Sequence, residues 1–234
     1  RRVLFRSPLV PVFHQAVFGQ AGHNIAVLNI GGIANVSLLH ADDRGAGAVV
    51  GFDTGPGNVL MDAWVMQHKG MPYDARGAWA AGGKVSQPLL EEALRGGYFS
   101  KPIPKSTGRD LFHAQWLQQL LAHFSDVSAQ DVQATLSELT TQSVALALDQ
   151  YGQGFASVYV CGGGALNDDL MRRLRLAIPA LHVGTSDELG VPVMQVEAAA
   201  FAWLAQQCVL RQSLNLETIT GARGSRVLGA IYPA

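Results

Sequence analysis

Apolar residues in the first third of the chain occur in short runs that are typical of buried strands. The runs cover residues 25–30, 33–39 and 48–53, and a Gly31-Gly32 pair and a polar turn separate them. Runs of this length, bounded by glycine or polar residues, indicate strands, and a Gly-Gly turn favours a hairpin between the first two. We therefore expect three strands in close succession.

Helical spacing of apolar residues begins after the third strand. The helix candidates are residues 58–67, 74–81, 87–95, 110–124, 128–151, 167–177 and 195–209. The longest opens with Ser128 and Asp131, which resemble a capping box. Its apolar stripe consists of Val132, Leu136, Leu139 and Leu146. Two more strands are expected at 156–161 and 181–183. This order predicts an α/β domain built on a mixed sheet with an antiparallel edge and flanking helices.

Composition excludes several classes of function. The 234 residues contain 17 Lys and Arg against 18 Asp and Glu, a net charge of −1. This balance gives no electrostatic basis for binding nucleic acid or an anionic membrane, and no apolar run is long enough to span a bilayer. Cys161 and Cys208 are far apart and lack a CxxC or Cys/His pattern, which favours two buried thiols in a reducing, cytoplasmic compartment. We expect no metal site made only of protein ligands.

The segment Gly51-Phe52-Asp53-Thr54-Gly55-Pro56-Gly57-Asn58 is the most informative stretch. It places one aspartate at the carboxyl end of an apolar strand, beside a turn rich in glycine and proline. Ligands bind at such strand ends in open α/β sheets, and glycines let the backbone approach a phosphate. Asp53 is therefore a candidate general base beside a phosphate or sugar pocket. The alternative is that Asp53 only caps the following helix.

Two glycine turns are candidate phosphate or nucleotide contacts. Gly31 and Gly32 form a hairpin turn followed by Asn35, and Gly162, Gly163 and Gly164 lie between a strand and a helix that Asn167 caps. Glycine removes the side chains where a charged or flat ligand would approach. Each turn could equally be an ordinary tight turn, because the full dinucleotide motif and a Walker lysine are absent.

Three further features suggest a polar ligand. The loop from Lys105 to Asp110 carries Arg109 and two hydroxyls and could hold an anionic or polyhydroxylated molecule. Glu197 begins a helix among alanines, where a ligand could approach closely, although an acid there also suits the helix N-terminus. The alternative for the loop from Lys105 to Asp110 is that it is only a solvated surface loop. The four tryptophans lie on helical patterns that favour the core over sugar-stacking positions.

Taken together and in this order, these segments resemble the anhydro-N-acetylmuramic acid kinase family. The matching pieces are Leu9-Val10-Pro11, Phe13-His14-Gln15, residues 29–35, residues 51–58 with Leu60-Met61-Asp62, Tyr73-Asp74, Gly77, residues 105–109, residues 161–167, Glu197-Ala198 and Phe201-Ala202-Trp203-Leu204. They cover nearly everything from Pro8 to about Leu204. The pairing of FDTGPGN with PKSTGR is the specific part of the match.

The resemblance implies the actin-like, ribonuclease H-like fold of the sugar kinase/Hsp70/actin superfamily, in which two α/β domains close over ATP. It implies a reaction that uses ATP, Mg²⁺ and water to open the 1,6-anhydro ring of anhydro-N-acetylmuramic acid and to phosphorylate O6 during peptidoglycan recycling. Asp53 matches the base that activates water, and Glu197 matches an acid of the sugar site. Asn58, Lys105 and Arg109 are expected substrate contacts. The expected nucleotide contacts are Gly31, Gly32, Gly162, Gly163, Gly164 and Asn167.

The resemblance also implies a domain organisation. The family's first phosphate loop, a Gly-Thr hairpin followed by Asp-Gly, has no counterpart in this chain. We expect residues 1–7 to be non-native, residues 8–24 to end a truncated N-terminal domain and residues 25–234 to form the C-terminal domain. A homodimer is expected, and this chain alone is expected to be inactive. The alternatives are another sugar or acetate kinase of this fold, or an inactive fragment that binds nucleotide or dimerises.

Overall fold

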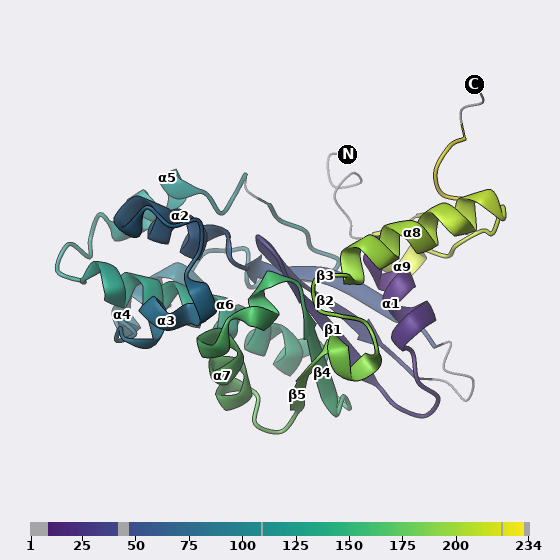
Figure 1. The fold of residues 1–234 in the computed structure, drawn as a ribbon, viewed down its shortest axis with the longest axis horizontal. Coiled ribbons are helices and arrows are strands. Elements are labelled where there is room, and N and C mark those ends of the chain that lie inside the picture. The colour runs from purple at the N-terminus through teal and green to yellow at the C-terminus, as the bar shows by residue number, and fades with distance from the viewer. Residues whose placement is uncertain (1–8, 42–46, 109, 221, 232–234) are drawn as a thin grey trace.

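The computed structural model describes residues 9–41, 47–108, 110–220 and 222–231. The segment 1–7 and Arg109 lie outside these described residues. Within them, five strands form one mixed sheet in the order β3-β2-β1-β4-β5 (Figure 1). The strands are β1 (Ile25–Ile30), β2 (Ile33–Leu39), β3 (Val49–Pro56), β4 (Ser157–Cys161) and β5 (His182–Thr185). The mixed sheet with flanking helices confirms the predicted α/β class.

Strand directions bring four carboxyl ends to one edge of the sheet. β1 runs parallel to β4 and β4 parallel to β5, whereas β2 runs antiparallel to both β1 and β3. β3 therefore runs in the same direction as β1. The glycine-containing turns at 31–32, 55–57 and 162–164 lie at the carboxyl ends of β1, β3 and β4. Ligands bind outside this edge in open α/β sheets, so the topology places the turns where the sequence predicts a site.

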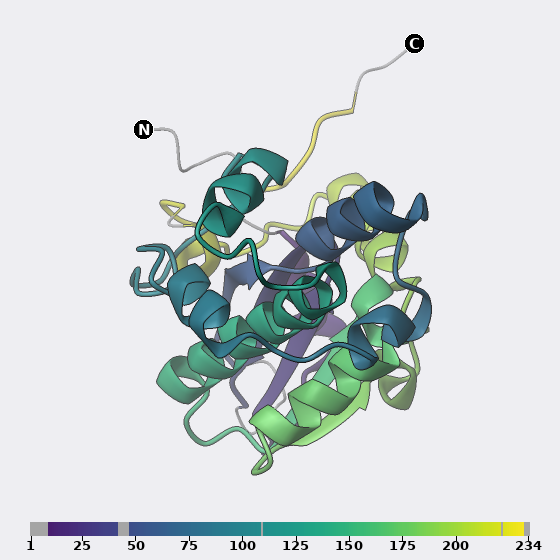
Figure 2. The same ribbon diagram turned by 90° about the vertical axis from the view of Figure 1, so that its left-hand side faces the viewer.

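Helices cover both faces of the sheet. On one face α6 (Ala129–Tyr151) packs on β2 and β3 and crosses the strands, as Figure 2 shows. Around α6 lie α2 (Val59–Lys69), α3 (Ala78–Ala81), α4 (Gln87–Leu94) and α5 (Ala114–Leu121). Helix α7 (Asp168–Ala177) packs beside α6 and contacts β5. Short 3-10 helices are η2 (Ala75–Gly77), η3 (Gly163–Leu166) and η4 (Ser186–Leu189). The other face carries α1 (Val10–Phe18), α8 (Val196–Val209) and α9 (Glu217–Thr220), on the right in Figure 1.

Each face of the sheet has its own hydrophobic core, because successive strand residues point to opposite faces. Leu28 and Phe52 are fully buried on the α6 face, and Val27 and Leu39 are fully buried on the α1 face. Helix α1 belongs to the second core and contacts β2, β3 and α8. Helix α1 thus packs directly on this sheet. The assignment of residues 8–24 to the end of a neighbouring domain stays a prediction.

The hairpin strands begin and end where the sequence predicts. β3 continues past Asp53, because its pairing with β2 extends to Pro56 opposite Ile33. The helix expected at 110–124 is shorter, because His113 caps α5 by accepting a hydrogen bond from the Trp116 backbone N–H at 3.2 Å. The sequence does not signal this cap, since histidine is not among the preferred N-cap residues.

The predicted stripe on α6 is wrong at one position. Leu146 is 49% exposed, whereas Val144, Ala147 and Leu148 are buried. Helix α6 packs on strands beneath it and on α2, α3, α4 and α7 around it, so several faces are covered and no single stripe describes it. Within the described residues, no helix combines the length and the apolar character that crossing a bilayer requires.

Candidate active site

Asp53 lies near the carboxyl end of the edge strand β3 and is held by a loop that crosses that edge. Its backbone N–H donates to the Lys105 carbonyl at 3.1 Å, and its own carbonyl accepts from the Tyr98 hydroxyl at 2.8 Å. The carboxylate oxygen Oδ2 accepts the Thr107 backbone N–H at 2.8 Å. The Asp53 side chain also accepts a hydrogen bond from the Ser106 hydroxyl. Backbone and side chain are therefore both fixed.

The surroundings of Asp53 suit a base. Asp53 is 7% exposed, and burial raises the pKa of its carboxyl above the ordinary value. The Thr107 amide and the Ser106 hydroxyl oppose that rise, because they donate hydrogen bonds that favour the ionised form. A buried carboxylate with an elevated pKa is a better proton acceptor than an exposed one, which is what general-base catalysis near neutral pH requires.

Strand register places Asp53 at one end of a row of polar side chains across four strands. Asp53 lies opposite Asn35 on β2, Asn35 lies opposite Asn29 on β1, and Asn29 lies opposite Cys161 on β4. All four belong to the alternating positions that face α1 and α8, as Val27 and Leu39 do on the same strands. With strands about 4.8 Å apart, the row spans roughly 14 Å. We call residues 29, 35, 53 and 161 the polar row.

Glu197 lies at the other end of the polar row, in the first turn of α8. Burial raises the pKa of the Cys161 thiol to about 12, and the negative charge of Glu197 contributes to that rise. The two acids that the sequence singles out, Asp53 and Glu197, therefore lie at opposite ends of one polar surface. The Cys161 Sγ lies 3.9 Å from Asn29 Oδ1, so the row is continuous between them.

The glycine turns lie beside this row at the same edge. Gly162 has a φ of +79°, and a Cβ there would meet Asn29 Oδ1 and the Ile30 carbonyl, so only glycine fits without strain. Gly31 differs, because a Cβ there would meet no atom closer than 3.9 Å. Open space above a backbone turn is what a bound phosphate needs. The backbone of the hairpin turn at Gly31 therefore borders a space that no other atom of the described residues fills.

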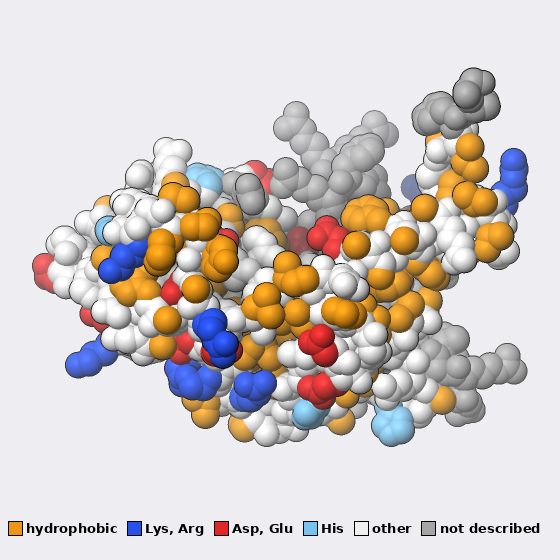
Figure 3. Space-filling model, viewed as in Figure 1, with side chains coloured by type: hydrophobic (Ala, Val, Ile, Leu, Met, Phe, Trp, Pro, Cys, Tyr) orange, Lys and Arg blue, Asp and Glu red, His pale blue; other side chains and the backbone are white. Residues whose placement is uncertain are grey.

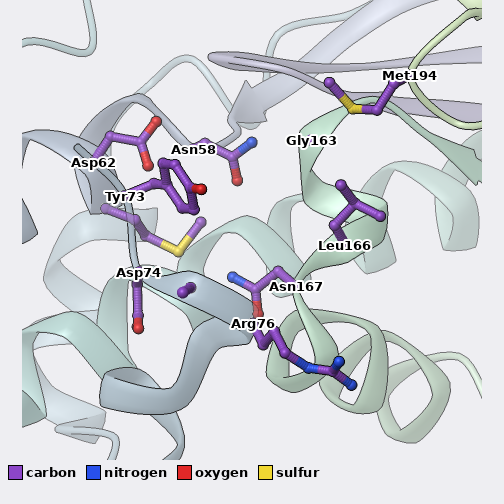
Figure 4. A pocket seen from close by; sticks show the side chains of 11 residues that line it. Asn58, Asp62, Tyr73, Asp74, Arg76, Gly163, Leu166, Asn167 and Met194 are labelled. Carbon is purple, nitrogen blue, oxygen red and sulfur yellow. The ribbon is translucent and has the colours of Figure 1, made fainter. Parts of the chain in front are cut away.

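Two cavities open at this edge on the side of α2. The first, of about 520 Å³, is lined by Asn58, Met61, Asp62, Tyr73, Asp74, Ala75, Arg76, Gly163, Leu166, Asn167 and Met194. Figure 4 shows Asn58, Asp62 and Tyr73 across the cavity from Leu166 and Met194. Arg76 points away from the cavity and pairs with Asp168 on α7, with 2.6 Å between Nε and Oδ2.

The second cavity, of about 550 Å³, is lined by Gly31, Gly32, Asn58, Val59, Asp62, Ala63, Met66, Pro72, Phe112, His113, Ala114 and Gly163. It shares Asn58, Asp62 and Gly163 with the first cavity, so the two form one cleft. Hydrophobic side chains gather over α2 and over the turn before α7 on this face (Figure 3). The cleft is thus mainly apolar at one end and opens onto the glycine hairpin at the other.

The predicted contact residues divide between these surfaces. Asn58 donates to the Ile30 carbonyl at 3.2 Å and lines both cavities. Asn167 Oδ1 caps α7 by accepting the Leu170 N–H at 3.0 Å, and its side chain lines the first cavity. Lys105 is buried with Nζ on the Phe99 carbonyl at 3.0 Å, so its ammonium supports the loop under Asp53. Its role as a substrate contact stays a prediction.

Sequence reasoning missed several residues of this region. Tyr98 is 45 positions from Asp53, and no local pattern links them. Met194 lines the first cavity although it is an exposed apolar side chain in a loop, and so does Tyr73, which the resemblance matches but to which it assigns no role. One signal was readable: Asn29 and Asn35 are equally distant from the centre of the hairpin, which pairs them across it. Among the described residues, no three His, Cys, Asp or Glu side chains come together as they would around a metal ion.

Comparison with known proteins gives the family. The family model described as anhydro-N-acetylmuramic acid kinase matches residues 6–234. Curated proteins of that name from Variovorax paradoxus and Cupriavidus pinatubonensis are 54% and 53% identical over 97% of this chain, and one from Nitrosomonas europaea is 47% identical. The chain spans about 60% of the length of these relatives.

Among solved structures, an activator of 2-hydroxyisocaproyl-CoA dehydratase from Clostridium difficile with bound ADPNP matches with a TM-score of 0.48 and 13% identity. This match covers 88% of the present chain and 68% of the activator. The family model covers nearly the whole sequence, and the sequence relatives carry the same name. The chain belongs to the anhydro-N-acetylmuramic acid kinase family.

Proposed function

We propose that these residues form the sugar and nucleotide sites of a kinase that acts on anhydro-N-acetylmuramic acid. In this proposal the whole protein opens the 1,6-anhydro ring with water and transfers the γ-phosphate of ATP to O6. The observation that carries the proposal is the position of Asp53, fixed by Ser106 and Thr107 at one end of the polar row and beside the glycine hairpin. Membership of the family supports the choice of substrate.

The polar row is the proposed sugar surface. Amide side chains at 29 and 35 can donate to and accept from hydroxyl and acetamido groups, and they lie between Asp53 and Glu197. The Asp53 carboxylate takes a proton from a water molecule, whose oxygen then bonds to the anomeric carbon. The bond from that carbon to O6 breaks, and O6 forms its new bond to the γ-phosphorus as ADP leaves. Positioning supplies much of the rate in such transfers.

The cleft beside α2 is the proposed nucleotide site. Its apolar end, with Met61, Tyr73, Leu166 and Met194, suits a flat base. The open backbone at Gly31 lies where phosphates would reach the edge of the sheet. Mg²⁺ usually binds through the substrate phosphates and one or two carboxylates, and Asp62 is the carboxylate that lines both cavities. Bound there, Mg²⁺ would neutralise charge on the phosphates.

Product analysis and calorimetry test this proposal. The whole protein is incubated with ATP, Mg²⁺ and anhydro-N-acetylmuramic acid in water enriched in ¹⁸O, and the products are analysed by mass spectrometry. We expect the 6-phosphate formed in the first turnovers to carry one ¹⁸O at the anomeric carbon, because water opens the ring. Unlabelled 6-phosphate kept in the same water for the same time corrects for exchange of the anomeric hydroxyl with the medium. A hexose and acetate serve as alternative acceptors, since the fold also suits kinases of those substrates. Phosphorylation of either in place of the anhydro sugar, or a product without ¹⁸O, would refute the proposal.

Calorimetry of this chain with ADP and with the anhydro sugar separates binding from turnover. Binding of ADP without turnover is the outcome expected of an inactive nucleotide-binding fragment, which is one of the alternatives that the sequence leaves open. We further propose a cytoplasmic protein, because ATP is the phosphate donor and both described cysteines are free thiols. We also propose a homodimer, which light scattering tests directly.

A further inference from the structure

His113 lies where the nucleotide cleft opens onto the glycine hairpin. Its side chain lines the second cavity together with Gly31, Gly32 and Gly163. His113 belongs to none of the sequence motifs described above. It precedes α5, and its extended backbone (φ −138°, ψ 170°) places it as the N-cap of that helix.

The N-cap contact determines which ring nitrogen of His113 can donate. The Trp116 backbone N–H donates to Nδ1 at 3.2 Å, so Nδ1 acts as an acceptor and carries no proton. A neutral imidazole with an unprotonated Nδ1 carries its proton on Nε2. The helix cap therefore orients the ring and leaves Nε2–H as a hydrogen-bond donor.

The cavity needs such a donor if it holds phosphate. Among the described residues that line it, none is Lys or Arg, and Asp62 is the acidic one. Backbone amides of the hairpin and the Asn58 amide can contribute hydrogen bonds, but Asp62 would repel any phosphate charge that Mg²⁺ does not neutralise. His113 is the lining side chain on the α5 side of the cavity that has an N–H donor.

We propose that His113 is a nucleotide-binding residue that donates a hydrogen bond from Nε2 to the phosphate chain. The inference rests on the proposed function, because it requires that the cleft bind a nucleotide. It extends that function by assigning a side chain from α5 to phosphate recognition. The glycine hairpin would then contact the phosphates from one side and His113 from the other.

Calorimetry with ADP and with adenosine tests the proposal on this chain. His113→Ser keeps an N-cap oxygen for the Trp116 N–H but removes the donor. We expect the Kd for ADP to rise roughly ten- to hundred-fold, the effect of one hydrogen bond to a charged group, and the Kd for adenosine to stay the same. His123→Ser, the same change in an exposed histidine beyond the end of α5, is the matched control and should leave both values unchanged.

The outcomes separate the two proposals. Equal ADP affinity of wild type and His113→Ser would overturn the role of His113 and leave the nucleotide site intact. A parallel loss of ADP and adenosine affinity would also overturn it, because the histidine would then support the fold of the cleft rather than a phosphate. If the wild-type chain and the whole protein both fail to bind ADP, the proposed function and this inference are both wrong.

Discussion

Replacing Asp53 with asparagine removes the proposed base and little else. Asparagine has the same shape, so its Oδ1 can still accept the Thr107 N–H and its Nδ2 can donate to the Ser106 hydroxyl. It cannot take a proton from water. General-base catalysis contributes roughly 10²–10⁴-fold, about 2.7–5.5 kcal/mol of activation free energy, and we expect turnover to fall by that factor.

The assay pairs turnover with nucleotide binding. Formation of the 6-phosphate is measured by a coupled ADP-release assay in the whole protein, and ADP affinity is measured by calorimetry. ADP affinity should stay within about two-fold of wild type, because Asp53 does not line either cavity of the cleft. Turnover that stays within a few-fold of wild type would refute the assignment of Asp53 as the base.

The Asp53→Asn variant also tests the pKa of Asp53 independently, through the stability of the fold. A carboxyl whose pKa is raised by folding binds more protons in the folded state, so its contribution to stability falls as pH rises from its ordinary value of 3.8 through the raised value. Above that window, ionised Asp53 opposes folding. Asp53→Asn should therefore unfold in urea at an equal or higher concentration than wild type near pH 7.5.

The stability difference should shrink as pH falls toward the ordinary carboxyl pKa of 3.8, because the raised pKa lets the folded wild-type carboxyl take up its proton above that pH. His14, whose pKa burial lowers to about 3, destabilises the fold in acid but does so in both proteins, so its effect cancels in the comparison. A variant that is less stable than wild type at pH 7.5, with a deficit that grows as pH rises, would contradict the pKa argument for Asp53.

Two further changes test the supports of the site. Tyr98→Phe removes the hydroxyl that donates to the Asp53 carbonyl, and we expect a loss of about 1–3 kcal/mol in unfolding free energy by urea titration. Tyr159→Phe on β4 is the control. Gly162→Ala introduces a Cβ at a φ of +79°, where it would meet Asn29 and Ile30. We therefore expect about 1–3 kcal/mol of destabilisation and weaker ADP binding. A Gly162→Ala variant with wild-type stability would contradict the described turn.

The sequence predicts those parts of the fold that depend on neighbouring residues. The hairpin strands end as expected because apolar runs and a glycine turn define them locally. The sequence wrongly predicts that Leu146 is buried, because the covered faces of α6 depend on helices from distant segments that pack around it.

In the candidate site, too, the features set by neighbouring residues are predictable and those set by distant segments are not. Its glycine turns and Asp53 are recognisable in the sequence, because each lies at the end of an apolar run. The opposition of Asn35 and Asp53 could not be predicted, since an irregularity in pairing beside Asn35 shifts the register between β2 and β3. The Tyr98 hydrogen bond and the cavity residues from loops depend on long-range folding. Only the three-dimensional fold brings them to the carboxyl edge of the sheet.

The polar row and the cleft beside α2 lie on different sides of the same sheet edge, with the glycine hairpin between them. In the proposed function, the sugar occupies the polar row and the nucleotide occupies the cleft, so each compound binds on its own side of that edge. That proposal predicts a ternary complex of protein, sugar and nucleotide, in which the phosphoryl group passes directly from donor to acceptor. Because no side chain has to hold that group in transit, the proposal predicts that steady-state kinetics lack a double-displacement pattern.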